Sequence, residues 1–252
     1  MKQAKRFTRI FGVILATAFM AFASTGVAHA LTTFTTPDAA LPAYSGNGLS
    51  VQLWTNVNVD TLAAARSYIS SNAATANFIS TVVDYPNGSA GSASTSSTFA
   101  SILGSDAASV DNASVLTQSV LNSIMLFTGY IRVDDAGTIM SLGIGSDDGS
   151  ELIIQDTQVL NNDGIHAFPG SGAGPTSIEF TSAGLYEIEI LFFESQEVQW
   201  GVEFFTGSTG CAVSGDLLYH DAGEPVPEPA TLLTLGAGLA AFARARRKNS
   251  SK

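Results

Sequence analysis

The chain has 252 residues, of which 11 are basic and 22 acidic, and its net charge at pH 7 is −11. The basic residues gather at the two ends, so residues 31–229 contain all 22 carboxylates but only two cations, Arg66 and Arg132, a net charge of −20. A nucleic-acid-binding protein needs a basic face that displaces phosphate counterions, so this class is excluded. An anionic membrane surface would repel the segment too. Cys211 is the single cysteine, so an intramolecular disulfide cannot stabilise the fold.

The first 30 residues have the three parts of a secretory signal peptide. Basic residues lie between Met1 and Arg9, an apolar run covers residues 10–22, and Ala28-His29-Ala30 offers small residues before a cleavage site after Ala30. A transmembrane anchor is the alternative, but the run is shorter than the roughly 20 apolar residues that a bilayer span needs. We therefore expect residues 1–30 to be a signal peptide.

The residues between the predicted cleavage site and position 98 have four different sequence patterns. Residues 31–43 contain two prolines and no periodic pattern, which predicts a linker. Apolar residues alternate over 48–54, which predicts a strand, and the alanine-rich residues 61–79 have helical spacing, which predicts a short helix and a loop. The glycine- and serine-rich residues 88–98 are typical of a surface loop.

The second half of the chain is rich in β-branched and aromatic residues separated by turn sequences. In 184–194, Tyr186, Ile188, Ile190 and Phe192 fall on one face while Glu187 and Glu189 fall on the other, as in a strand that covers a core and faces water. The other predicted strands are residues 123–133, 137–146, 150–155, 176–180 and 198–205. We expect residues 44–215 to form one all-β domain, an antiparallel β-sandwich with a short helical and loop insertion near its N-terminal end.

Sequence patterns of known catalytic sites are absent. The glycines of residues 143–149 have the wrong last spacing for a dinucleotide loop, and no helix is predicted after them. There is no Gly-x-Ser-x-Gly nucleophile motif. Glu187 and Glu189 are better explained by a solvent-facing strand surface than by a glycosidase pair. The sequence therefore predicts that the protein is not an enzyme.

Asp147 and Asp148 are the strongest candidates for a functional site. They lie between two predicted strands, so we expect them at the rim of the sandwich, where binding groups are displayed on a rigid scaffold. Calcium binds six to eight oxygen atoms, and two aspartates supply some of them. Consecutive side chains converge most easily on one ion if the peptide bond between them is cis. An acidic turn with a purely structural role remains the alternative.

Three segments of this region resemble the PA-fourteen (PA14) domain, a β-sandwich named for anthrax protective antigen and found in flocculins and other adhesins. They are GYIRVDDAGTIMSLGIGSDDGSELII at 129–154, NNDGIH at 161–166 and GLYEIEILFFESQEVQWGVEFF at 184–205. In the lectin members an Asp–Asp pair joined by a cis peptide holds a calcium ion that chelates vicinal sugar hydroxyls. Asp147 and Asp148 match that pair.

The resemblance also implies a second ligand loop at Ser195-Gln196-Glu197-Val198-Gln199-Trp200-Gly201. Gln196 would supply its side-chain oxygen to calcium, and Val198 and Trp200 their backbone carbonyls. The sequence departs from the flocculins in having glutamine rather than asparagine at position 196 and in lacking their loop cysteines. Sugar binding would then involve Asp147, Asp148 and Gln196.

The C-terminal residues resemble a second known element. After a spacer at 216–226 come Pro227-Glu228-Pro229, an apolar run at 230–243 and a basic end, the order of a PEP-CTERM sorting signal. For the tail at 227–252 this resemblance implies processing by an exosortase, transient contact with the membrane, and delivery to the cell surface or extracellular matrix of a Gram-negative bacterium. An ordinary C-terminal membrane anchor is the alternative.

Together these features predict an exported, calcium-dependent carbohydrate-binding protein of the lectin or adhesin type. Its expected cofactor is Ca²⁺, and its expected partner is a glycan such as the exopolysaccharide of the cell. The alternative is a structural protein of the biofilm matrix that uses the sandwich for protein–protein packing.

Overall fold

The computed structural model describes residues 31–86, 91–195 and 198–222. The predicted signal peptide with its cleavage site at Ala30 lies outside the described residues. So do Gln196 and the sorting tail with Pro227, Glu228 and Pro229.

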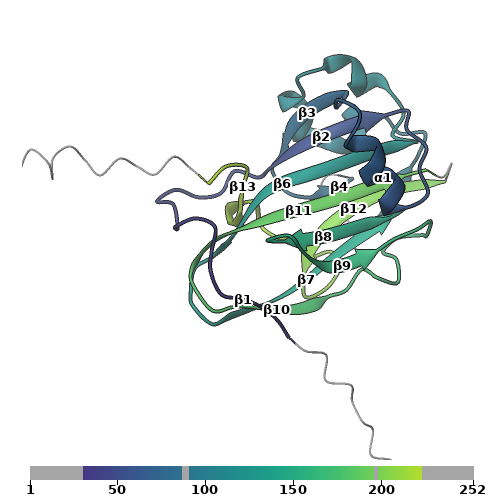
Figure 1. Cartoon of the computed structure of the whole chain (residues 1–252). Helices are drawn as coiled ribbons and strands as arrows, with labels where there is room; N and C mark the ends of the chain where they lie inside the picture. Colours follow the sequence, from purple (N-terminus) through teal and green to yellow (C-terminus); the bar gives the residue numbers. More distant parts are fainter. Residues whose placement is uncertain (1–30, 87–90, 196–197, 223–252) are drawn as a thin grey trace, which may run out of the picture. The chain divides into compact units, whose positions relative to one another are not determined.

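Two sheets face each other and confirm the predicted β-sandwich (Figure 1). The first has the order β1 (Thr32–Phe34), β10 (Thr176–Phe180), β7 (Thr138–Asp147), β12 (Gln199–Thr206) and β4 (Asp84–Tyr85), with β5 (Ala93–Ser94) also pairing with β12. The second has the order β3 (Ala76–Ser80), β2 (Leu49–Thr55), β6 (Ser123–Val133), β11 (Gly184–Glu194), β8 (Ser150–Ile154) and β9 (Thr157–Asn162), with β13 (Leu218–Tyr219) pairing with β6. Among the described strands, β1 runs parallel to its neighbour β10 and the other pairs are antiparallel.

The main hydrophobic core fills the space between the sheets. Alternation along β11 brings Tyr186, Ile188, Ile190 and Phe192 into it, as the sequence predicts. Aromatic rings dominate the packing: Phe180 contacts Tyr186 at 4.6 Å between centroids, and Phe192 meets Trp200 edge-on at 5.1 Å. A short helix, α2 (Phe99–Leu103), adds Phe99, Ile102 and Leu103, and 3-10 helices at Gly104–Ser109, Ala113–Thr117 and Gly215–Leu217 complete the connections.

Helix α1 (Leu62–Ile69) covers part of the outer face of the second sheet (Figure 1). A second apolar cluster lies beneath it and includes Leu62 and Ala65 of the helix with Leu191 and Phe193 of β11. The guanidinium of Arg66 pairs with Glu151 at 2.7 Å and also with Glu189, which fixes the helix to β8 and β11. Leu191 and Phe193 are therefore buried although they lie on the face opposite to the main core.

The short helix predicted within 61–79 is present, but part of the loop predicted after it is a strand. Helix α1 ends at Ile69, and residues 76–80 form strand β3, which pairs with β2. Thr61 caps the helix N-terminus by accepting a hydrogen bond from the Ala64 amide at 3.2 Å. Pairing with an adjacent strand therefore outweighs the helical spacing of alanines after residue 70.

The structure also differs from the prediction at both ends of the domain. The segment 31–43, predicted as a linker, contains β1, and the segment 216–226, predicted as a spacer, contains β13. Phe34 of β1 is buried and its ring stacks on Phe180 at 5.7 Å. Leu218 and Tyr219 of β13 are likewise fully buried. Burial of these side chains binds both segments to the sandwich, although neither has a periodic pattern long enough to reveal a strand.

Neither α-helix in residues 31–86, 91–195 and 198–222 has the length and hydrophobicity required to span a membrane.

The position of β1 predicts that Phe34→Ala destabilises the domain. Removal of a buried aromatic side chain leaves a cavity beside Phe180 and Tyr186 and should lower the free energy of unfolding by about 3 kcal/mol, measured by urea denaturation. Thr35→Ala, at the exposed neighbouring position, is the control and should change stability by less than about 0.5 kcal/mol. Equal stability of Phe34→Ala and the wild type would restore the linker interpretation.

Candidate functional site

The Asp147–Asp148 pair lies where the chain passes from one sheet to the other. Strand β7 belongs to the first sheet and ends at Asp147, whereas β8 belongs to the second sheet and begins at Ser150. The two strands are thus not a hairpin, and the turn between them is at the rim of the sandwich, as predicted. The Asp147–Asp148 peptide bond is cis, as expected for two side chains that converge.

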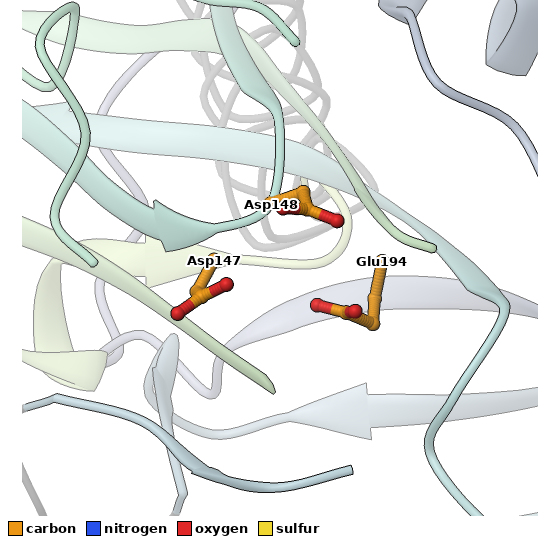
Figure 2. Close-up of side chains that lie close together, drawn as sticks. All are labelled: Asp147, Asp148 and Glu194. Carbon is orange, nitrogen blue, oxygen red and sulfur yellow. The ribbon is translucent and has the colours of Figure 1, made fainter. Parts of the chain in front are cut away.

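Glu194, the last residue of β11, joins the two aspartates. One carboxylate oxygen from each of Asp147, Asp148 and Glu194 lies within 4.8 Å of the others. Figure 2 shows the Glu194 side chain extending toward the aspartates. The exposed fractions are 6% for Asp147, 1% for Asp148 and 0% for Glu194, so water reaches these groups poorly. We call these three residues the carboxylate cluster.

Backbone amides from two segments hold Asp148. Its Oδ1 accepts a hydrogen bond from the His166 amide at 3.0 Å, and its Oδ2 accepts one from the Ser195 amide at 3.1 Å. The Ser195 hydroxyl lies 3.4 Å from the same oxygen. Asp147 accepts one backbone hydrogen bond, from Phe168 at 3.2 Å. These donors stabilise the ionised carboxylates and fix their directions.

The two arginines among the described residues form their ion pairs with carboxylates outside the cluster. In the described part of the chain, Arg66 pairs with Glu151 and Glu189, and Arg132 pairs with Asp134 at 2.6 Å. Burial raises the pKa of Asp147, and the nearby charge of Asp148 raises it further, although the Phe168 amide and His166 act in the opposite direction. Ionisation of Asp147 is therefore less favourable in this buried site than in water.

The loop at residues 163–175 is anchored beside the cluster by Asn162. The side-chain amide of Asn162 donates to the Ser146 hydroxyl at 3.1 Å and to the Pro169 carbonyl at 2.9 Å, and its oxygen accepts from the Gly172 amide at 2.9 Å.

A Cβ atom at Gly149 would overlap the ring of Phe193. Glycine after the Asp–Asp pair thus allows the turn to approach β11 closely.

The structure brings together only some of the residues predicted to bind calcium. Asp147 and Asp148 are brought together, whereas Gln196 lies outside the described residues. Val198 is exposed, and its carbonyl accepts a hydrogen bond from the Thr95 amide at 3.4 Å. Trp200 is fully buried, its indole N–H donates to the Ser123 hydroxyl at 3.1 Å, and its neighbour Gly201 pairs with Asp147 across β7 and β12. Of this segment, Gly201 therefore lies beside the cluster.

Sequence reasoning missed Glu194. A signal for it exists, because residue 194 has the same parity as the core-facing Tyr186, Ile188, Ile190 and Phe192 of β11. An acidic residue in phase with the buried face of a strand needs a compensating partner. Glu187 and Glu189 have the opposite parity. Glu187 is exposed, in agreement with the prediction of a solvent-facing surface, whereas Glu189 is half-buried and pairs with Arg66 of helix α1.

Comparison with protein families gives two matches. The PA14 domain model matches residues 117–216, and the model of the PEP-CTERM protein-sorting motif matches residues 225–248. No curated protein matches the chain. The PEP-CTERM motif indicates export and sorting to the cell surface in Gram-negative bacteria.

Two solved structures with similar folds are described as PA14 domains. The PA14 domain of the MpAFP antifreeze protein superposes with a TM-score of 0.59 at 17% identity, over 76% of this chain and 100% of that one. The PA14 sugar-binding domain from an RTX adhesin gives a TM-score of 0.55 at 19% identity, over 71% of this chain and 99% of that one. The Epithelial Adhesin 6 A domain from Candida glabrata, solved with Galb1-3GlcNAc, gives a TM-score of 0.47 at 13% identity, over 74% of this chain and 92% of that one. The chain thus carries a β-sandwich that resembles the PA14 domain in sequence over residues 117–216 and in fold beyond them, followed by a PEP-CTERM sorting motif.

Proposed function

We propose that this protein is an exported, calcium-dependent carbohydrate-binding protein of the adhesin type, without catalytic activity. The observation that carries the proposal is the carboxylate cluster, in which three buried acidic groups lie within 4.8 Å of one another. Carboxylate oxygens are the ligands that calcium prefers, so the residues present fit this ion. The RTX adhesin domain of similar fold, described as sugar-binding, lends further support.

Residues from three parts of the chain would hold the ion. Asp147 and Asp148 would supply carboxylate oxygens from the β7–β8 turn, and Glu194 would add a third from the end of β11. The carbonyls of Val198 and Trp200 and the side chain of Gln196 remain proposed ligands from the family resemblance. When bound, calcium would supply a positive centre that accepts two adjacent hydroxyl groups of a sugar.

The surroundings of the cluster suit a neutral glycan. The segment 31–229 has a net charge of −20, so it attracts divalent cations and repels anionic polymers at low ionic strength. The sorting motif would deliver the domain to the cell surface through an exosortase, and the exopolysaccharide of the cell would be its glycan partner. The tail would contact the membrane only during this processing.

One observation favours a second candidate, a structural matrix protein that uses the sandwich for packing. Asp148 already accepts hydrogen bonds from His166 and Ser195, so it joins two loops without any metal. In this case the cluster only holds the two loops together, and calcium has little effect on the stability of the protein. The following experiments separate the two candidates.

Calcium should stabilise the protein measurably. If the dissociation constant is about 10⁻⁴ M, as in extracellular calcium modules, 1–10 mM calcium should raise the free energy of unfolding by roughly 1.5–3 kcal/mol. Asp147→Asn should abolish this gain and leave the fold intact, since Asp147 makes one backbone hydrogen bond that an amide oxygen can retain. Asp135→Asn, at an exposed turn, is the control with the same charge change. Urea denaturation that is identical in calcium and in chelator would reject the metal site.

Glu194→Gln tests the contribution of the third carboxylate. Loss of one charge should weaken calcium binding by about tenfold or more, because a unit charge at ~4 Å is worth several kcal/mol at an effective dielectric constant of 20. Without metal the same substitution removes one charge from the cluster, and the protein should remain folded. Isothermal titration calorimetry measures the affinity, and Glu187→Gln on the exposed face of β11 is the control. If Glu194→Gln unfolds the protein in chelator, the structural role prevails.

A glycan array decides between adhesin and scaffold. The full chain should bind one or more neutral glycans in millimolar calcium and lose them in chelator, and Asp147→Asn should bind none. Calcium-independent binding, or no binding by the wild type in calcium, would favour the structural matrix protein.

A further inference from the structure

Glu203 is a buried acidic residue that does not belong to the carboxylate cluster. It lies on β12 with an exposed fraction of 1%, and its neighbours Val202 and Phe204 enter the main core, so Glu203 lies on the outer face of the first sheet. Its Oε1 accepts a hydrogen bond from the Gly210 amide at 2.6 Å, whereas its Oε2 is buried without a hydrogen-bond partner among the described residues. A buried carboxylate oxygen in this situation is costly, so its retention requires an explanation.

A second carboxylate, that of Asp84, stands opposite Glu203 on the neighbouring strand. Strands β4 and β12 are antiparallel, and Asp84 pairs with Glu203 as Tyr85 pairs with Val202. Tyr85 and Val202 both enter the core, so the two acidic residues share the outer face. Facing side chains of antiparallel strands are about 5 Å apart at Cβ, and like charges in this position are destabilising.

Strand β7 borders Glu203 on its other side. It places Gly145 opposite Glu203. Its charged residue, Asp147, pairs instead with Gly201, two positions along β12 from Glu203. The strand position that directly faces Glu203 on this side is therefore uncharged.

The loop that follows β9 covers the sheet at Gly145, since a Cβ atom there would lie 2.9 Å from the ring of Phe168. The titratable residues of this loop have partners elsewhere. Asp163 accepts a hydrogen bond from the first residue of helix α1, and the His166 ring nitrogen Nε2 lies 3.0 Å from the carbonyl of the last residue of β9.

The turn after β12 lies next to Glu203 as well. It contributes the Gly210 amide, and its titratable residue, Cys211, is exposed. The arginines in residues 31–86, 91–195 and 198–222 form their ion pairs with other carboxylates. Asp84 is thus the ionisable group that the described structure sets directly against Glu203.

Burial raises the pKa of Glu203, and the charge of Asp84 raises it further, while the Gly210 amide acts in the opposite direction. A carboxyl group of this kind holds a proton more readily in the folded domain than in the unfolded chain. In the protonated form it has an O–H group that donates to a neighbouring carboxylate, and the repulsion between two charges is absent.

We propose that Asp84 and Glu203 form a proton-dependent lock on the outer face of the first sheet. With a proton on Glu203, its O–H donates to the Asp84 carboxylate and holds β4 against β12. When the proton leaves, two charged carboxylates face each other across this strand pair, and β4 is bound less firmly. The lock goes beyond the proposed function and does not depend on it.

The direction of the pH dependence follows from the raised pKa in the folded state. The contribution of Glu203 to stability is fully present below its pKa in the unfolded chain, whose ordinary value is 4.5, and is lost as pH rises through the folded pKa. The domain should therefore lose the stabilisation provided by this pair when the medium changes from mildly acidic to neutral or alkaline.

Glu203→Gln tests the lock, because its amide oxygen accepts from Gly210 and its amide N–H groups are permanent donors in place of the carboxyl O–H. Urea denaturation of the full chain is measured in chelator between pH 5 and pH 8. The midpoint of the variant should exceed that of the wild type by an amount that is smallest at pH 5 and widens to about 0.5 M at pH 8. Glu179→Gln is the matched control, because Glu179 on β10 faces Thr33 and Ile139 rather than a carboxylate, and it should not produce this widening.

Asp84→Asn supplies the second arm of the test. It removes the facing charge, so its midpoint should also rise relative to the wild type as pH increases. Combined with Glu203→Gln it should give no further pH-dependent gain, because the two substitutions remove one and the same interaction. Hydrogen exchange locates the effect: after correction for intrinsic rates, peptides that contain β4 should lose more protection between pH 5 and pH 8 in the wild type than in Glu203→Gln.

A midpoint difference between Glu203→Gln and the wild type that is the same at pH 5 and pH 8 would overturn the inference. So would a wild type that is more stable than this variant at pH 8. If Glu203→Gln does not fold, Asp84→Asn alone decides, and a constant difference from the wild type across the pH range rejects the lock. Because every measurement is made in chelator, these outcomes are independent of the proposed calcium site.

Discussion

Three carboxylates, from Asp147, Asp148 and Glu194, lie within 4.8 Å of one another at a place that water hardly reaches. Their mutual repulsion opposes folding unless a cation or a dense set of hydrogen bonds compensates for it. The amides of His166, Phe168 and Ser195 provide part of that compensation. The loops on both sides of the cluster are thereby held in place by the same charges that would bind the ion.

The architecture explains why the cluster forms at this point. Strand β7 lies in one sheet and β8 in the other, so the residues between them must cross the edge of the sandwich. Strand β11 is the neighbour of β8 and ends at Glu194, and β12 pairs with β7 at Gly201 opposite Asp147. A connection between sheets, rather than a hairpin within one, therefore joins residues from both layers at a single rim. Asp147 is the last residue of β7, and Asp148 lies in the connection that leads to β8 in the other sheet.

Local patterns predicted the strands that have long alternating or apolar sequences, and β6, β10 and β11 have the predicted bounds. Short strands such as β1 and β13 were missed, because two or three residues carry no periodic signal and owe their structure to tertiary burial of Phe34, Leu218 and Tyr219. The Asp147–Asp148 pair was predicted from its turn position and family resemblance. Glu194 was not, since strand parity alone places it on the buried face, and its proximity to the aspartates depends on the pairing of β11 with β8.

A crystal structure of the full chain grown in millimolar calcium tests most directly whether this cluster is a calcium site. We expect an anomalous-scattering peak about 2.3–2.6 Å from oxygens of Asp147 and Asp148. The peak should be lost in crystals of Asp147→Asn. A well-ordered cluster with water or protein donors in place of a peak, at calcium concentrations well above 10⁻⁴ M, would contradict the claim.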